Sequence, residues 1–215
     1  MPKESKSDRT KAFIIEQVAP VFNKQGYVGT ALSDIEKATG LTKGAIYGNF
    51  ANKNTLAEAC FERNILPLQR GVHSAIGSGG GAMTKLVALL NFYKTHYEHI
   101  AENGGCPLLN TSTEVDDTIP IMKKKVQGSI LNWKNELSAV IKKGQMAGEF
   151  RSVVKAEKFS ITIILCPISF HLVPGNKFKD LKVPALKHGN GLELLTFGVL
   201  FDRVRAIFNI AMLFA

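Results

Sequence analysis

The stretch from residue 31 to residue 50 constrains the fold more than any other part of the chain, because it predicts two short helices joined by a tight turn. Gly40 follows the first apolar repeat, where a glycine commonly ends a helix, and Thr42 is a good N-cap for the second helix. The inward faces are predicted at Leu32, Ile35 and Ala38 in the first helix and at Ile46 and Phe50 in the second. A helix, a short turn and a second helix form the plan of a DNA-binding helix-turn-helix motif.

Two glycines, Gly44 and Gly48, lie four residues apart in the second helix, which we expect to be eight residues long. Each costs about 1 kcal/mol relative to alanine in a helix interior. With the apolar residues turned inward, both glycines fall on a side that can face DNA, where a missing side chain lets the backbone come close. Lys43, Tyr47 and the first-turn N–H groups are then expected to reach phosphate oxygens. The alternative is that the glycines simply mark a loop.

The longer segment "VFNKQGYVGTALSDIEKATGLTKGAIYGNFANKNTL", from Val21 to Leu56, carries a specific resemblance. Over residues 9–63 the chain resembles the DNA-binding domain of the TetR family of transcriptional regulators. The resemblance implies an all-α homodimer whose paired recognition helices straddle an operator on double-stranded DNA, and a C-terminal helical domain that binds a small-molecule effector. We therefore expect a disordered arm at residues 1–8, a helix-turn-helix domain at 9–53, and an effector-binding and dimerisation domain at 54–215.

The resemblance also implies which residues face DNA. Thr30 and Thr42 are expected to make backbone and phosphate contacts, and Thr30 also reads as the N-cap of the first helix. Gly48 departs from family members that carry a larger residue there, which affects the base preference beside it. Tyr27 is expected in the core. The full DNA-facing set is Thr30, Thr42, Lys43, Gly44, Ala45, Tyr47, Asn49 and Lys53.

Beyond residue 53 the sequence predicts further helices, from about 54 past 63, from 83 to 101 and from 118 to 147. In TetR-like proteins the space between such helices holds the ligand. The candidate effector-pocket residues are Phe92, Cys106, Leu108, Leu109 and Trp133. For each of them, an ordinary place in the core is an equally good interpretation.

Cys106 lies in the sequence "NGGCPLL", just before or at a predicted helix start. The positive end of the helix dipole lowers the pKa of a thiol in such a place, which favours a sensor of oxidants or electrophiles. A small residue that merely packs in the pocket wall is the simpler interpretation.

Composition bounds the other functional classes. The three cysteines are far apart, and no signal peptide is recognised, so we expect a protein of the cytoplasm. Most of the formal net charge of +9 comes from residues 123–158, where the lysines are expected to form a solvated helix face rather than a second DNA site.

His96 and His99 suggest an alternative function, that of an enzyme or metalloprotein. They lie three residues apart among acidic side chains, a spacing that can bind a metal. The sequence contains no HExxH motif, phosphate loop or nucleophile–base pairing. We therefore expect no enzymatic activity, no cofactor and no metal.

Residues 159–215 are atypical for the family. Pro167 and Pro174 interrupt a predicted helix, and the apolar end of the chain raises a membrane-associated interaction protein as a further alternative. Asp202, Arg203 and Arg205 stand in the middle of that apolar end and argue against a membrane span, so we expect no membrane partner. This stretch is either a final helix of the dimer interface or a replaced ending.

Overall fold

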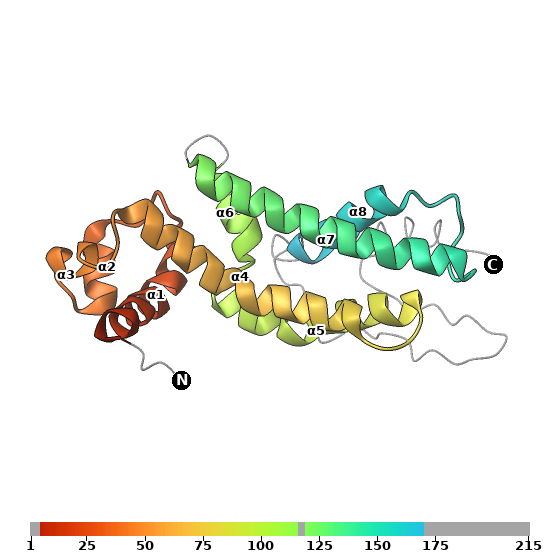
Figure 1. Cartoon of the computed structure of the whole chain (residues 1–215), viewed down its shortest axis with the longest axis horizontal. Coiled ribbons are helices and arrows are strands. Elements are labelled where there is room, and N and C mark those ends of the chain that lie inside the picture. Colours follow the sequence, from red (N-terminus) through yellow and green to blue (C-terminus); the bar gives the residue numbers. More distant parts are fainter. Residues whose placement is uncertain (1–4, 116–118, 170–215) are drawn as a thin grey trace. The chain divides into compact units, whose positions relative to one another are not determined.

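The computed structural model describes residues 5–115 and 119–169, and these form α-helices with no strand among them. Figure 1 shows their order along the chain. The helices are α1 (Lys6–Gln25), α2 (Leu32–Thr39), α3 (Lys43–Tyr47), α4 (Lys53–Gly77), α5 (Ala82–Glu102), α6 (Pro107–Val115), α7 (Pro120–Met146) and α8 (Ala156–Ser169). The expected all-α fold is confirmed.

The first helix begins at Lys6, so residues 6–8 belong to a helix and not to the disordered arm that we expected at 1–8. A capping box at Ser5 explains the difference, since the Ser5 hydroxyl oxygen accepts from the Asp8 N–H at 3.1 Å. The Asp8 carboxylate in turn accepts from the Ser5 N–H at 3.4 Å. These bonds satisfy backbone donors that the helix leaves unpaired at its start. The capping residues Ser5 and Asp8 therefore extend α1 over positions where no apolar pattern indicates a helix.

The helices group into two compact units. The first unit holds the described residues up to Gly71 together with those of Glu98–Ser129, and so combines α1, α2, α3 and α6 with the beginnings of α4 and α7. Contacts join α1 to α2, α2 to α3 and α1 to α6. Its buried apolar side chains include Ile14, Val18, Phe22, Ile35, Ile46, Phe50, Leu56, Phe61 and Leu108.

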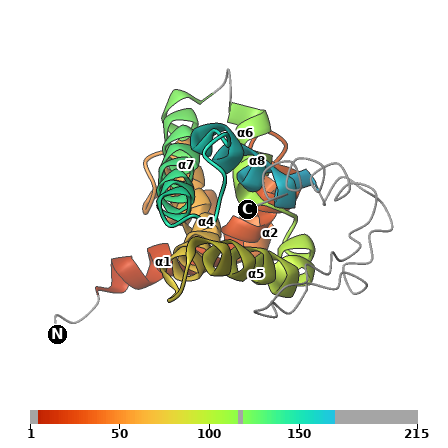
Figure 2. The same cartoon turned by 90° about the vertical axis from the view of Figure 1, so that its right-hand side faces the viewer.

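The second unit holds Val72–Tyr97 and the described residues from Ile130 onward. Figure 2 shows α7 and α8 side by side, and their buried hydroxyls meet where Ser138 Oγ lies 2.9 Å from Ser160 Oγ. On α7, half of the surface of Leu131 is exposed, whereas Trp133 and Leu137 are buried. The core of the second unit includes Ile76, Leu86, Leu89, Trp133, Leu137, Ile141, Phe159 and Ile163.

The α8 helix continues to Ser169 through Pro167, which we expected to interrupt it. The predictions for the apolar tail, and for Pro174, fall outside the described residues. Among the helices that the model describes, none combines the length and the apolar character that a membrane span requires.

Candidate nucleic-acid interface

The turn between α2 and α3 is set by bonds that lie close in sequence. Gly40 adopts a left-handed conformation at φ +67°, and its N–H donates to the Glu36 carbonyl at 2.8 Å. Glycine reaches this conformation without the steric cost of a Cβ, as expected of a residue that ends a helix. At the start of α2, the Asp34 carboxylate accepts from the Ala31 N–H at 2.8 Å.

Thr30 does not cap α2, and that expectation was wrong. Ala31 is the N-cap residue, and the Thr30 hydroxyl instead donates to the Gly26 carbonyl at 2.6 Å. Only 1% of Thr30 is exposed. The side chain therefore closes the loop after α1 from the inside, and its expected DNA contact stays a prediction.

The α3 helix is five residues long rather than eight, and its first turn is occupied by the protein itself. Thr42 caps the helix as expected, with its hydroxyl oxygen accepting from the Ala45 N–H at 3.4 Å. The Lys43 N–H donates to Glu36 Oε1 at 2.7 Å. The expectation that the first-turn N–H groups are free for phosphate is wrong for these two donors. Sequence reasoning missed Glu36, because a carboxylate seven residues before its partner leaves no periodic signal.

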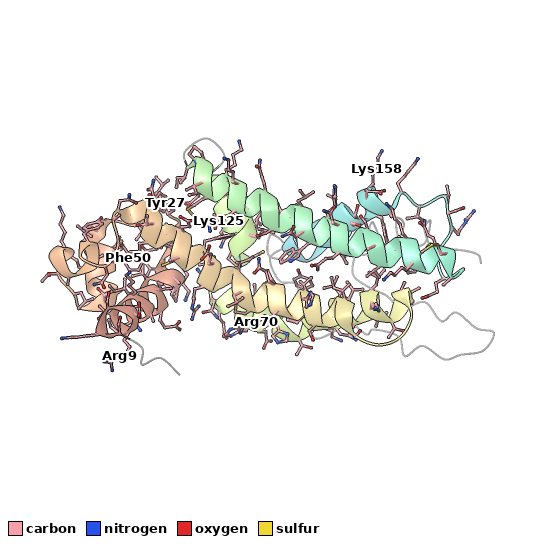
Figure 3. The ribbon with its side chains drawn as sticks, in the orientation of Figure 1. Arg9, Tyr27, Phe50, Arg70, Lys125 and Lys158 are labelled. Carbon is pink, nitrogen blue, oxygen red and sulfur yellow. The ribbon has the colours of Figure 1, made fainter. Side chains whose placement is uncertain are left out.

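The side of α3 that is turned away from the core is open. Ile46 is fully buried and Phe50 nearly so, as expected; Figure 3 labels Phe50 in this region. A Cβ added to Gly44 would meet only the Thr42 hydroxyl, at 4.0 Å, so nothing inside the protein requires glycine there. A Cβ on Gly48 would lie 3.1 Å from the Gly44 carbonyl oxygen, which is a tight contact. Gly48 thus has an internal structural reason, whereas Gly44 leaves space on the outer surface.

Some of the predicted DNA-facing side chains are exposed, and others are half-buried, two of them hydrogen-bonded within the protein. Thr42, Lys43 and Gly44 are exposed, and Ala45, Tyr47, Asn49 and Lys53 are half-buried. The Asn49 amide donates to the Ala45 carbonyl at 2.9 Å. Lys53 Nζ donates to the Tyr27 carbonyl at 2.6 Å and lies 4.6 Å from the centre of the Tyr27 ring. Burial lowers the pKa of Lys53 from its usual value, against the raising effect of Glu114 and Asp34.

Tyr27 was expected in the core, but it is half-buried, with its ring beside Phe22 and its hydroxyl at the surface. Its ring centre lies 5.8 Å from that of Phe22, and its hydroxyl donates to Asn54 Oδ1. Burial raises the pKa of Tyr27, with a smaller contribution from Tyr47. Figure 3 labels Tyr27. The residue therefore links the end of α1 to the beginning of α4, which fixes the base on which α2 and α3 rest.

The C-terminal end of α1 is joined to α6 and the loop before it by a set of polar bonds. The Asn23 amide donates to the Asn103 carbonyl at 2.6 Å and to the Gly105 carbonyl at 3.1 Å. The Asn110 amide donates to the carbonyls of Gly104, at 2.7 Å, and Asn23, at 3.0 Å. We call this set the α1–α6 junction. No motif in the sequence indicated it.

Glu114 completes the α1–α6 junction. Its carboxylate accepts from the Tyr27 N–H at 2.5 Å, directly beyond the end of α1. Gly26 has φ +80°, and any Cβ there would overlap the Glu114 carboxylate. The backbone conformation favours glycine at residue 26, and a Cβ there would also displace the Glu114 carboxylate from the Tyr27 N–H.

The five candidate effector-pocket residues fall in both units. Cys106, Leu108 and Leu109 belong to the first unit, while Phe92 and Trp133 belong to the second. Cys106, Leu108 and Trp133 are buried, and the other two are half-buried. A cavity of about 460 Å³ in the second unit and one of about 20 Å³ in the first have none of the five in their walls. The proposed pocket stays a prediction.

The thiol of Cys106 does not have the lowered pKa that its position before α6 suggested. The residue is 6% exposed, and burial raises its pKa. Bonds from the backbone of Leu109 and Leu108 act in the opposite direction but are smaller. Desolvation of the thiolate outweighs the helix terminus here, because the sulfur is removed from water. The alternative of a small packing residue accounts better for this environment.

The histidine cluster does not assemble a metal site within residues 5–115 and 119–169, where no three His, Cys, Asp or Glu side chains come together. His96 Nδ1 lies 2.8 Å from the Phe92 carbonyl oxygen, and its ring packs against the Phe92 ring. His99 lies beside Asn103. The acidic residues Asp116 and Asp117 fall outside the described residues.

Comparison with known proteins shows to which family this chain and its arrangement of helices belong. Residues 14–60 match the family model "Bacterial regulatory proteins, tetR family", and residues 82–172 match "Tetracyclin repressor-like, C-terminal domain". The crystal structure of a TetR-family transcriptional regulator from Cytophaga hutchinsonii is 33% identical, covers 99% of this chain and all of its own, and superimposes with a TM-score of 0.77. This chain belongs to the TetR family.

Two further TetR-family relatives agree. A TetR transcriptional regulator from Chloroflexus aurantiacus is 32% identical over 78% of this chain and 86% of its own, with a TM-score of 0.71. The transcriptional repressor DhaR from Mycobacterium sp. (strain GP1) is 24% identical over 64% of this chain and 68% of its own. The TetR-family chain described here is thus a DNA-binding transcriptional regulator. A homodimer that responds to a small ligand is typical of this family. The enzyme, metalloprotein and membrane alternatives find no support in these matches.

Proposed function

We propose that the protein is a dimeric repressor in which the outer side of α3 reads the major groove of an operator. Lys43 and Tyr47 contact phosphates, with help from Thr42 and Asn49, while Gly44 and Ala45 let the backbone approach the bases. The observation that carries this proposal is the open space around Gly44 on a helix whose start is held from inside by Thr42 and Glu36. In this proposal Thr30 and Lys53 act through the backbone they fix, around Gly26 and Tyr27.

We further propose that residues 54–215 form the effector-binding and dimerisation region, and that regulation rather than catalysis is its role. A small effector there shifts the population towards a conformation whose two recognition helices no longer match successive major grooves. The protein acts in the cytoplasm, where its operator is. Repression is supported by the family and by the name of the DhaR relative.

The test measures binding of the full-length protein to labelled DNA from upstream of its own gene, by fluorescence anisotropy at several salt concentrations. We expect a Kd that weakens steeply with salt, because phosphate contacts release counterions. Lys43→Ala is expected to weaken binding about tenfold and to make the dependence on salt less steep. Tyr47→Phe removes only the hydroxyl, whereas Tyr47→Ala removes the ring as well, so the two variants together show which group contributes to binding.

Lys158→Ala is the matched control, since this exposed lysine lies on α8, outside the proposed surface (Figure 3). Equal loss in Lys43→Ala and Lys158→Ala would mean that only general positive charge binds DNA. Sedimentation equilibrium on the same samples measures the dimer. If the protein is a monomer and still binds this DNA with the expected dependence on salt and on Lys43, the proposed dimer is refuted but the proposed contacts of α3 are not.

A further inference from the structure

The second unit contains a cavity of about 460 Å³ that the proposed operator binding does not use. It is formed by the end of α4, the beginning of α5 and the C-terminal half of α7. This volume is in the range of sites for small organic molecules. Its apolar wall includes Ile76, Ala82, Ala139, Val140 and Ala147.

Charged side chains border the cavity, among them the carboxylates of Glu136 and Glu149. Glu149 accepts from the Ala82 N–H at 2.9 Å and from the Met83 N–H at 2.8 Å, and so caps the start of α5. Glu136 Oε1 lies 4.0 Å from His73 Nδ1. Both carboxylates therefore have a donor or a basic ring beside them.

The two lysines of the same cavity, Lys85 and Lys143, are in a different situation. Neither ammonium group has a hydrogen-bond or ion-pair partner among residues 5–115 and 119–169. By contrast, Lys142, the neighbour of Lys143 along α7, pairs with Glu157 at 2.5 Å and does not line the cavity. The cavity thus joins an apolar wall to two ammonium groups that form no ion pair in the described part of the chain.

The wall of the cavity is held tightly in place. A Cβ on Gly144 would lie 2.5 Å from the Phe150 ring and 2.6 Å from the Ala82 Cβ, so α7 and the first turn of α5 are in close contact there. The Glu149 bonds fix the same turn of α5. Packing as close as this resists collapse of the space beside it.

We propose that this cavity binds a small amphipathic carboxylate, with the anionic group at Lys85 and Lys143 and the hydrocarbon part on Ile76, Ala82 and Val140. A ligand carboxylate supplies the hydrogen-bond partner that the two ammonium groups lack, and a charge-assisted hydrogen bond to an ammonium is among the stronger polar contacts. The apolar wall requires that the rest of the molecule be hydrocarbon. The site is separate from the predicted effector pocket, because none of those five residues lines it.

Isothermal titration calorimetry of the full-length protein with sodium octanoate tests the site. We expect saturable binding with one octanoate per chain. Octan-1-ol, which has the same chain but no charge, is expected to bind about tenfold more weakly, and octylammonium, with the opposite charge, more weakly still. The measurement requires no DNA, so its result is independent of the proposed operator contacts.

Variants locate the binding. Lys85→Met and Lys143→Met keep most of the aliphatic stem, and each is expected to weaken octanoate binding about tenfold while leaving octan-1-ol binding unchanged. Lys142→Met is the matched control and is expected to bind like the unmodified protein. Ala139→Phe, at an exposed residue of the wall, fills the cavity and is expected to abolish binding of both compounds.

Three results would overturn the proposal, provided that circular dichroism shows each variant folded. The first is no saturable octanoate binding. The second is equal affinity for octanoate and octan-1-ol, which would make the lysines irrelevant. The third is binding that survives Ala139→Phe or falls equally in Lys142→Met, which would place octanoate elsewhere on the protein.

Discussion

The α2–α3 turn and the α1–α6 junction are built from similar bonds over very different distances in sequence. At the turn, Thr42 bonds three residues ahead and Glu36 bonds seven residues ahead. At the junction, Asn23 and Glu114 bond to partners 80 to 87 residues away. The turn can form as soon as α2 and α3 do, whereas the junction exists only when the whole first unit is folded. The start of α3 is therefore shaped by local bonds, whereas the attachment of the end of α1 to α6 depends on residues that are remote in sequence.

Gly26→Ala is the sharpest way to break the junction. Alanine at φ +80° is strained, and its Cβ would overlap the Glu114 carboxylate, so we expect a loss of about 3 kcal/mol in the free energy of unfolding. Urea denaturation measures it. The control is Gly77→Ala, where no atom lies within 4 Å of the added Cβ, and a change of under about 1 kcal/mol is expected. Similar values for the two variants would show that α6 does not constrain the end of α1.

Asn110→Ala removes only the bonds that the Asn110 amide donates within the junction, without adding an atom. The carbonyls of Asn23 and Gly104 lose a donor in a half-buried place, and we expect about 2 kcal/mol of destabilisation. Thr113→Ala, at an exposed residue of the same helix, controls for helix propensity and is expected to change stability by under about 0.5 kcal/mol. If Asn110→Ala is no worse than this control, the amide bonds contribute nothing net to folding.

The contrast also explains what the sequence could predict. The helical fold, the inward faces at Ile46 and Phe50 and the Thr42 cap depend on periodicity and on residues a few positions apart, and all were predicted. The length of α3 was overestimated, because apolar spacing continued past the point where the helix ends. The junction was missed because Asn23 and Asn110 carry no pattern that pairs them. The packing role of Cys106 was among the interpretations of the sequence, but the direction of its pKa shift depends on burial by distant residues and could not be predicted from its place before a helix.

Thr42→Ala tests the local side of the comparison. It removes the bond to the Ala45 N–H, and helix caps of this kind contribute about 1 kcal/mol, less than either change at the junction. Thr42→Ser keeps the hydroxyl and is expected to restore most of the loss. Equilibrium unfolding of the three proteins gives the order. A cost for Thr42→Ala above that of Asn110→Ala would reverse the comparison, and would mean that the turn rather than the junction stabilises the first unit.

The ion pair between Glu16 and Arg63 is remote in sequence but exposed, so it tests whether distance in sequence matters without burial. The two residues are 47 positions apart, and Arg63 Nε lies 3.0 Å from Glu16 Oε2. The hydrogen bond to Arg63 lowers the pKa of Glu16 below its usual value. The pair therefore contributes stability above the unfolded pKa of about 4.3, and this contribution is lost as the pH falls through the lower folded pKa. Because solvent screens exposed ion pairs, we expect Glu16→Gln to cost under about 1 kcal/mol at pH 7 and less at pH 3. Denaturation curves at the two pH values measure this difference. A cost as large as that of Asn110→Ala would mean that remoteness in sequence alone, rather than the partial burial of the α1–α6 junction, makes a contact important for this fold.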